Sequence, residues 1–205
     1  MQVFYIHPEN PQPRLIEQVA DLLRKDQLII YPTDTSYAFG CRLGAKDALE
    51  KLKQIRALDD KHQFTLLCRD LSEIANYAAV DNVQFKQLKA HTPAPITFIL
   101  NATKDVPKKL AHAKKKTIGI RVPSNAIAQA LLEAMDEPIL TSSLILPNRD
   151  DILDDPFEIE ELLGNQIDGL INAGIKTTKL TTIVDMTSSQ PEIIRQGAAD
   201  VSSLL

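Results

Sequence analysis

Tryptophan is absent from this 205-residue chain, and aromatic residues make up only 5% of it. Aromatic side chains are the platforms on which single-stranded nucleic acids stack, so the sequence offers little for that mode of binding. Apolar runs are short as well, and none approaches the ~20 residues that span a bilayer. The first ten residues have neither a basic start nor a long apolar stretch, which argues against a signal peptide. We therefore expect a cytoplasmic protein with no membrane partner.

Cysteine and histidine, the usual ligands of structural metals, are scarce. The two cysteines, Cys41 and Cys68, do not form a C-x-x-C pair. We interpret both as buried free thiols; a disulfide between them stays open and would be unusual in the cytosol. The histidines do not have the spacing of zinc ligands, and they are His7, His62, His91 and His112. The sequence therefore predicts no metal site.

The motifs of several large enzyme classes are missing too. There is no G-x-x-x-x-G-K-[ST] phosphate loop and no G-x-G-x-x-G dinucleotide motif. A G-x-S-x-G nucleophile elbow is absent, and no order of serine, histidine and aspartate indicates a catalytic triad. No catalytic residue can be assigned from motifs of this kind.

What the chain does contain is the composition of a globular protein, with 44% apolar and 24% charged residues. The length and the lack of a linker favour a single domain over residues 1–205. Charge is uneven: residues 1–125 carry 19 Lys/Arg against 13 Asp/Glu, a net of +6, and residues 126–205 carry 4 against 14, a net of −10. A local positive field attracts phosphate, although two solvated faces would give the same counts.

Apolar periodicity predicts helices and strands along the whole chain. Helices are expected over 13–25, 46–58, 82–90, 125–135 and 157–163, the fourth with Ser124 as its N-cap. Strands are expected over 27–31, 39–41, 64–68, 96–100, 117–122, 138–146, 169–172, 181–185 and 192–195, and a basic, partly looped segment over 104–116. Several strands follow one another without a helix, which predicts an α/β fold with a mixed sheet.

Polar side chains follow the first predicted strand. Thr33 and Thr35, with Asp34 between them, come directly after the buried run that ends at Tyr31 and Pro32. Hydroxyl and free backbone N–H groups just past a strand end bind small polar ligands. An ordinary turn with local side-chain hydrogen bonds is the alternative, and composition alone favours the turn.

Cations gather at the end of the helix predicted over 46–58. Lys53 and Arg56 lie three residues apart on one helix face, and Lys61 and His62 follow soon after. The planar fork of arginine suits phosphate or carboxylate. A solvated amphipathic face is the alternative interpretation.

Three lysines, Lys114, Lys115 and Lys116, lead into the strand that carries Arg121. An arginine among apolar neighbours needs a partner, which is either a ligand in a groove or a C-terminal carboxylate in a buried salt bridge. Hydroxyl groups and a further cation recur at three later strands. They can converge on phosphate groups, and they are Ser143, Thr181 and Arg195.

In their order and spacing, these segments resemble the YrdC-like family, which includes threonylcarbamoyl-AMP synthase. The likeness runs from about Ile6 to the end of the chain and is strongest to the YciO branch, through the segments 4–8, 62–70 and 116–124. The family landmarks are Tyr31-Pro-Thr-Asp-Thr35 with Gly40, Arg56, Pro95-Ile-Thr-Phe-Ile-Leu100, Gly119-Ile-Arg-Val-Pro123, Thr141-Ser-Ser143, Thr181-Thr-Ile-Val-Asp185 and Arg195-Gln-Gly197.

The resemblance implies a single α/β domain with a twisted, mixed sheet flanked by helices and a large, positively charged groove that binds ATP or AMP, and RNA. Synthases of this family are nucleotidyltransferases that take L-threonine, bicarbonate and ATP with Mg²⁺. They release pyrophosphate and form threonylcarbamoyl-AMP, the donor for the t6A base of certain tRNAs. An N-carboxylated threonine attacks the α-phosphate, so the reaction needs positioning and charge neutralisation more than a protein nucleophile.

The resemblance also implies roles for the candidate residues. Thr33 and Thr35 would lie near the amino acid, and Arg56 and Arg121 would meet carboxylate or phosphate. The remaining candidates of the nucleotide site would be Lys61, His62, Ser143, Thr181 and Arg195.

Two positions depart from the synthase pattern. Gln54 stands where the synthases carry the lysine of a Lys-x-Arg pair, and Ile145 stands where they carry the asparagine of Ser-x-Asn. Losing a charge-assisted donor to phosphate costs about 1.5–3 kcal/mol. Synthase activity is therefore in question, while the fold and the groove are not.

Two other functions stay open. A protein of the same fold without synthase activity would bind tRNA or double-stranded RNA by charge and shape, with Lys114, Lys115 and Lys116 as contacts. A hydrolase that acts on t6A or on an adenylate is neither supported nor excluded by the sequence.

Overall fold

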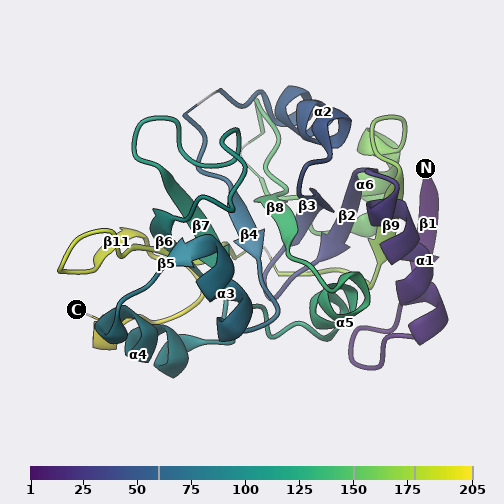
Figure 1. Ribbon diagram of the computed structural model, residues 1–205. Helices are drawn as coiled ribbons and strands as arrows, with labels where there is room; N and C mark the ends of the chain where they lie inside the picture. Colours follow the sequence, from purple (N-terminus) through teal and green to yellow (C-terminus); the bar gives the residue numbers. More distant parts are fainter. Residues whose placement is uncertain (60, 150, 178, 205) are drawn as a thin grey trace.

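The computed structural model describes residues 1–59, 61–149, 151–177 and 179–204. An 11-stranded sheet runs through this part of the chain (Figure 1). Its strands are β1 (Gln2–Tyr5), β2 (Ile29–Pro32), β3 (Tyr37–Arg42), β4 (Thr65–Leu67), β5 (Ala78–Ala79), β6 (Ile96–Ala102), β7 (Thr117–Arg121), β8 (Ile139–Ser143), β9 (Gly169–Asn172), β10 (Thr182–Asp185) and β11 (Glu192–Arg195).

The strand order is β1-β9-β2-β3-β8-β4-β7-β6-β10-β11, with β5 beside β6. Antiparallel pairing joins β2, β3, β8 and β4 in the middle of the sheet. Parallel pairing joins β1 to β9, β9 to β2, β4 to β7 and β6 to β10. The predicted α/β fold with a mixed sheet is thus confirmed.

The helices are α1 (Pro13–Arg24), α2 (Lys46–Arg56), α3 (Leu71–Tyr77), α4 (Asn82–His91), α5 (Ala126–Met135) and α6 (Pro156–Leu163), and a short 3₁₀ turn covers Ser202–Leu204. Each predicted helix is present with bounds shifted by at most two residues. The prediction of Ser124 as the cap of α5 is wrong, because Asn125 holds that position and its side chain accepts from the Ala128 N–H. A side-chain oxygen is effective as a cap only where it reaches the N–H groups of the first turn.

Alternating side chains along the strands build an apolar cluster on each face of the sheet. On β2, Ile29 and Tyr31 face the cluster formed with α1 and α5, whereas Ile30 faces the cluster formed with α2 and α6. Figure 1 shows α2 and α5 on opposite sides of the sheet, and the two chain ends at its opposite edges. The sheet is therefore covered by helices on both faces.

One part of the sheet face that carries α1 and α5 is not covered by them. On β4 and β8, Leu67 and Ile139 pack into the cluster with α5. Two residues further along the same face, Thr65 and Thr141 line a cleft instead. The cleft thus lies on the sheet, beside the covering helices.

Both cysteines have the environment that the sequence predicts. Cys41 and Cys68 are buried free thiols on β3 and just after β4. Burial raises the pKa of the Cys41 thiol to about 12 and that of Cys68 well above its ordinary value. Among the described residues, no helix combines the length and the apolar character that crossing a membrane requires.

Candidate functional site

Two adjoining cavities form one cleft on the open part of the sheet. The residues that line both cavities all carry a hydroxyl group, and they are Thr65, Thr97, Thr141, Ser142, Ser143 and Thr181. One cavity adds Thr33, Thr35 and Arg121, and we call it the threonine end. The other adds Arg56 and Arg195 with His62, has a volume of about 110 Å³, and is called the arginine end.

The threonine end is built on the turn between β2 and β3. The Thr33 hydroxyl donates to the Ser36 carbonyl oxygen at 2.7 Å and accepts from the Thr35 N–H at 3.2 Å. Both threonine side chains are buried, with only 2–3% of their surface exposed. The alternative of a turn with local side-chain hydrogen bonds is thus confirmed, and the same turn lines the cleft.

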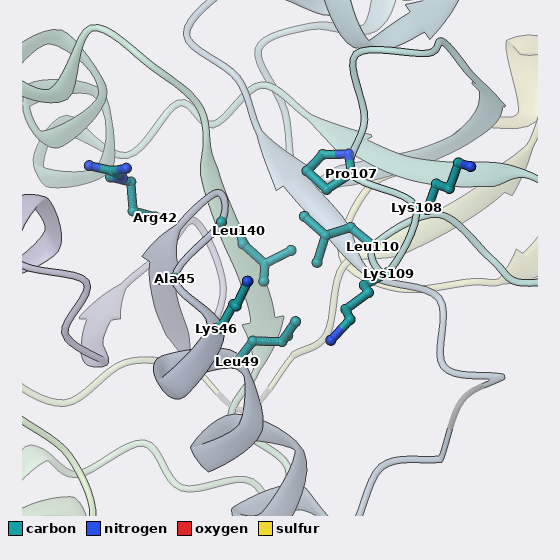
Figure 2. Close-up of a pocket in the computed structure, with 10 residues that line it drawn as sticks. Arg42, Ala45, Lys46, Leu49, Pro107, Lys108, Lys109, Leu110 and Leu140 are labelled. Carbon is teal, nitrogen blue, oxygen red and sulfur yellow. The ribbon is translucent and has the colours of Figure 1, made fainter.

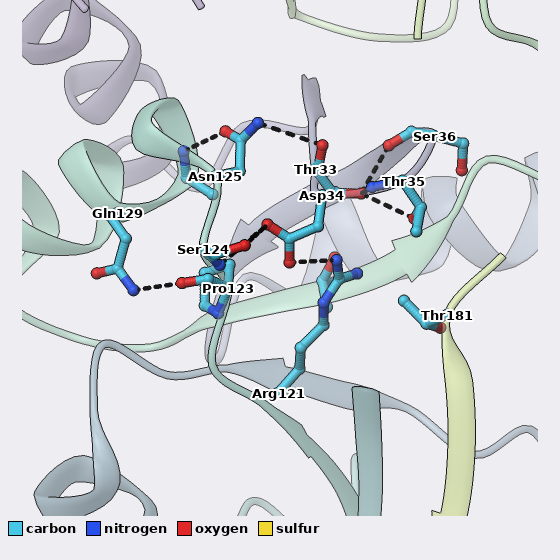
Figure 3. Close-up of polar contacts among 12 residues, drawn as sticks. Thr33, Asp34, Thr35, Ser36, Arg121, Pro123, Ser124, Asn125, Gln129 and Thr181 are labelled. Carbon is cyan, nitrogen blue, oxygen red and sulfur yellow. Dashed lines mark hydrogen bonds and ion pairs between the residues drawn. The ribbon is translucent and has the colours of Figure 1, made fainter. Parts of the chain in front are cut away.

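Arg121 reaches the same end from β7 and forms a buried ion pair with Asp34 (Figure 3). Its Nη2 lies 2.8 Å from the Asp34 carboxylate, and the two side chains are 7% and 5% exposed. The second carboxylate oxygen accepts from the N–H and the hydroxyl of Ser124, both at 2.9 Å. The alternative of a C-terminal carboxylate as the partner of Arg121 is wrong, because its guanidinium pairs with Asp34 of the turn between β2 and β3.

The arginine end holds two guanidinium groups whose hydrogen-bond acceptors are uncharged. Arg56 donates from Nε to the Ile145 carbonyl oxygen at 3.0 Å and from Nη1 to the Ser142 hydroxyl. Arg195 donates to the carbonyl oxygen and the hydroxyl of Thr181, both at 3.0 Å. Within the described residues, no carboxylate forms an ion pair with either arginine.

Burial shifts the ionisation of these cations. It lowers the pKa of Arg56 to about 10, and the nearby charge of Arg195 lowers it further. Burial also lowers the pKa of Arg195. Two cations that share a partly buried space, with no carboxylate from the described residues, form a site where an anion is favoured.

His62 lies beside Arg56 at the same end. Burial lowers the pKa of its imidazole to about 4, with the Arg56 charge as the second cause and Asp59 acting in the opposite direction. The ring meets the edge of Phe64 with their centroids 4.9 Å apart. At neutral pH the imidazole is therefore uncharged and can both donate and accept a hydrogen bond.

The remaining predicted residues lie outside the cleft. Lys61 is exposed in the loop after α2, where its N–H donates to the Asp59 carboxylate at 2.9 Å. The three lysines of the loop before β7 are exposed as well, and they are Lys114, Lys115 and Lys116. Of the departures, Gln54 is exposed on α2 and lines neither cavity, whereas Ile145 lines the arginine end.

Two glycines of the sequence motifs let neighbouring backbone segments come close together at the cleft. A Cβ atom at Gly119 would lie 2.5 Å from the Thr65 hydroxyl, and one at Gly197 would lie 2.4 Å from the Leu180 carbonyl oxygen. A side chain at Gly197 would push against backbone atoms, and one at Gly119 would displace the Thr65 side chain and press on the Phe64 carbonyl oxygen at 3.0 Å. Glycine at these two positions therefore allows Thr65 and Thr181 to occupy their places in the cleft.

Sequence reasoning missed several residues of the site. The sequence places Asp34 in the ligand-binding segment without indicating that it pairs with Arg121, and it gives no role to Asn125. The signal for Thr65 and Thr97 is a single hydroxyl residue inside an otherwise apolar run, and Thr141 stands in the landmark Thr141-Ser-Ser143. In a strand whose neighbours are buried on one face, such a residue marks an uncovered patch on the other face.

Comparison with known proteins identifies the family. The family model named for Sua5, YciO and YrdC, and described as telomere recombination, matches residues 21–197. The chain belongs to the Sua5/YciO/YrdC family. The expected resemblance to YrdC-like proteins and to the YciO branch is thus confirmed.

Three relatives illustrate the range of the family. YciO of Escherichia coli K12 is 51% identical over 204 residues, covering 100% of this chain and 99% of the relative, and its crystal structure matches with a TM-score of 0.96. A candidate threonylcarbamoyl-AMP synthase of Methanocaldococcus jannaschii is 26% identical over 211 residues, covering 99% and 96%. The crystal structure of P. abyssi Sua5 with L-threonine shares the fold, with a TM-score of 0.89 at 19% identity, over 99% of this chain and 59% of that one.

Proposed function

We propose that the protein binds an adenylate in the cleft and forms threonylcarbamoyl-AMP from L-threonine, bicarbonate and ATP. The observation that carries the proposal is the pair of guanidinium groups, Arg56 and Arg195, which face one cavity without a carboxylate partner in the described residues. Guanidinium groups suit phosphate because their N–H groups match two phosphate oxygens at once. The arginine end is accordingly the phosphate site of the proposal.

The threonine end is the amino-acid site of the proposal. Arg121 keeps a buried Nε without a hydrogen-bond partner among the described residues, and it lines the cavity with Thr33 and Thr35. A buried donor of this kind is costly unless a ligand or water satisfies it, and a ligand carboxylate would do so. The presence of L-threonine in the P. abyssi Sua5 structure supports an amino acid in this fold.

In the proposed reaction, an amino acid bound at the threonine end reacts with a nucleotide whose phosphates lie at the arginine end. The amine of threonine adds to bicarbonate with loss of water and gives a carbamate. A carbamate oxygen then attacks the α-phosphorus of ATP, and the bond to pyrophosphate breaks as the new P–O bond forms. Holding both reactants in one cleft and neutralising the phosphate charge are the contributions that Arg56, Arg195 and the hydroxyl groups make to this step.

Magnesium enters the proposal only with the nucleotide. No group of three or more metal-binding side chains occurs among the described residues, and the residues that line the cleft include no carboxylate. Mg²⁺ prefers carboxylate and phosphate oxygens. The side chains of the cleft therefore do not fit an ion held by the protein, and Mg²⁺ is part of the ATP substrate.

The test is pyrophosphate release from ATP that depends on both threonine and bicarbonate, with chromatographic detection of threonylcarbamoyl-AMP. Arg56→Ala is expected to lower kcat/KM by roughly 10- to 100-fold, because it removes a charge-assisted donor to phosphate. Arg69→Ala, which changes an exposed arginine bonded to Asp136, is the matched control and leaves the rate unchanged. If the folded wild type binds AMP but forms no threonylcarbamoyl-AMP, the proposed reaction is wrong.

A further variant addresses the two departures. Gln54→Lys combined with Ile145→Asn restores the synthase pattern and is expected to raise the rate of the wild type. The carbonyl group of Ile145 that holds Arg56 belongs to the backbone, so this bond survives the substitution. An unchanged rate would contradict the roles given to positions 54 and 145.

A second candidate function is recognition of double-stranded RNA or tRNA beside the cleft. A further cavity, next to the arginine end, is lined by three lysines with His62 and one carboxylate, Asp59; the lysines are Lys53, Lys108 and Lys109. The loop that carries the latter two continues into the exposed lysines 114–116. Several cations along one loop suit the spaced phosphates of an RNA helix.

The RNA proposal is tested by fluorescence anisotropy with a double-stranded RNA over a range of salt concentrations. Changing lysines 114–116 to glutamine should weaken binding and reduce the slope of log K against log salt by about one for each lysine that neutralises a phosphate. Lys86→Gln, at an exposed site on α4, is the control. Binding that is unchanged in the triple variant would remove this loop from the proposal.

A further inference from the structure

An apolar cavity of about 150 Å³ lies between the first turn of α2 and the loop before β7 (Figure 2). Its walls include the side chains of Ala45, Leu49, Leu110 and Leu140, each with 6% or less of its surface exposed. Figure 2 shows the three leucines around one space. A cavity of this volume with such walls accepts a group about the size of a benzene ring.

The rim of the cavity is cationic. Its charged residues are Arg42, Lys46, Lys108 and Lys109, and no carboxylate among the described residues lines it. Arg42 is paired with Asp26 and Glu137 at 3.3 and 3.5 Å. The three lysines have no carboxylate within ion-pair distance in the part of the chain that the structure describes. An apolar space with unneutralised ammonium groups at its mouth complements a molecule with an apolar body and a negative head.

We infer that this cavity binds a small organic anion, a carboxylate whose apolar body is about the size of a benzene ring. The ring would occupy the space between Leu49, Leu110 and Leu140, and the carboxylate would meet Lys46 and Lys109 at the rim. The N-cap residue of α2, Ala45, has no side chain to bond the first-turn N–H groups. The positive end of the helix adds to the attraction for the anion, and Asp47 in the first turn offsets part of it.

This site is separate from the cleft. It shares no lining residue with the threonine end or the arginine end. Helix α2 begins at the cavity with Lys46 and ends at the cleft with Arg56, so the two sites are about 15 Å apart along the helix. The inference consequently does not depend on what the cleft binds.

Three probes separate the apolar and the ionic parts of the inference: benzoate, the neutral benzyl alcohol, and acetate. Methyl resonances of Leu49, Leu110 and Leu140 are followed by NMR in the wild-type protein. We expect benzoate to shift these resonances at lower concentration than either other probe, and we expect AMP not to displace it. Equal binding of benzyl alcohol or acetate, or displacement of benzoate by AMP, would overturn the inference.

Two variants test the residues. Ala45→Leu fills the cavity and should abolish the benzoate shifts, and Lys46→Gln should weaken benzoate binding roughly three- to fivefold, as the loss of one exposed ionic partner does. Lys86→Gln is the matched control for charge and leaves benzoate binding unchanged. Because Lys46 is exposed, its substitution does not disturb packing, and an unchanged affinity in Lys46→Gln would contradict the ionic part of the site.

Discussion

At the scale of single residues, the ion pair between Asp34 and Arg121 has the largest expected effect on stability. Both side chains are buried, so removing one leaves the other as a buried charge without its ionic partner. Asp34→Ala should lower the free energy of unfolding by about 3–5 kcal/mol, measured by urea denaturation. Arg69→Ala breaks an exposed pair and should cost less than about 1 kcal/mol. Equal losses in the two variants would contradict the burial of the Asp34 pair.

His62 gives the protein a specific dependence on pH. Its pKa of about 4 lies below the ordinary value of 6.5, chiefly because of burial and then because of the Arg56 charge. Between these two values the unfolded chain binds a proton that the folded protein does not. The stabilising contribution of neutral His62 is therefore fully present above pH 6.5 and is lost as the pH falls toward 4.

The pKa of His62 also responds to the charges in the arginine end of the cleft. Arg56→Gln removes one cause of the lowering, so the pKa of His62 should rise, as measured from its ring proton resonance during an NMR titration. An anion bound beside Arg56 should move the pKa of His62 in the same upward direction. Arg24→Gln, far from the cleft on α1, should leave it unchanged, and a downward shift in Arg56→Gln would be inconsistent with the proximity of the two side chains.

Candidate residues could be predicted where a polar or charged side chain stands among apolar neighbours and therefore needs a partner. Arg121 inside an apolar strand is such a residue, and its burial bears out the need for a partner. The identity of the partner was not predictable, because Asp34 and Arg121 are 87 positions apart and meet only in the folded chain. Lys61 does not reach the cleft for a similar reason, since closeness to Arg56 in sequence does not fix the direction of a loop.

At the scale of elements, Asn125 connects helix α5 to the threonine end. Its side-chain oxygen accepts from the Ala128 N–H at 3.0 Å, and its side-chain nitrogen donates to the Thr33 carbonyl oxygen at 3.2 Å. Asn125→Ala should lower the free energy of unfolding by about 1 kcal/mol or more, because the cap and this connection are both removed. Asn125→Asp keeps the cap acceptor and loses the donor.

The two variants at Asn125 therefore have different signatures. Asn125→Asp should remain close to wild-type stability in urea denaturation while its affinity for the ligand of the threonine end falls. Ser124→Ala is the comparison variant. It removes a hydrogen bond to Asp34 and leaves the cap of α5 in place, because Asn125 is the cap. A loss of stability in Asn125→Asp as large as that in Asn125→Ala would show that the cap is not the main role of this side chain.

Most elements with a strong apolar pattern were predicted, and two short, half-exposed ones were not. The buried strand at 169–172 has the predicted bounds, and so does the half-exposed strand at 192–195. Strand β1 was missed because it is an edge strand in which only Phe4 is buried. Helix α3 was missed because it has seven residues and contributes only Ile74 as a buried apolar side chain. Patterns of this length do not distinguish a helix from a loop.

At the scale of the whole molecule, strand order could not be read from the sequence. The first strand pairs with the ninth, so that Gln2 lies opposite Gly169, and the cleft depends on similar pairings of β4, β8 and β10. Which strands become neighbours is decided by packing over the whole chain, whereas periodicity reports only on local structure. The residue types of the cleft were therefore predictable, and its complete lining was not.

The two buried thiols can be used to follow unfolding of the whole protein. Cys41 and Cys68 are both buried in the sheet and have raised pKa values. Because the thiolate is the reactive form, both should resist a thiol reagent in the native protein and react together when the protein unfolds. Labelling followed by mass spectrometry across a urea gradient should give the same midpoint as circular dichroism. Rapid labelling of one cysteine without urea would reveal local opening at that strand.

The hydrogen bonds of Arg56 and Arg195 have a consequence for any phosphate that enters the cleft. Both guanidinium groups already donate to oxygens of their own chain, at Ile145, Ser142 and Thr181. A bound phosphate therefore replaces hydrogen-bond acceptors that the two arginines already have. The enthalpy of phosphate binding should be smaller than the number of new hydrogen bonds suggests. The carbonyl oxygens of Ile145 and Thr181 would then accept hydrogen bonds from water instead. The backbone around these two residues should become more mobile, while the rest of the cleft becomes more rigid.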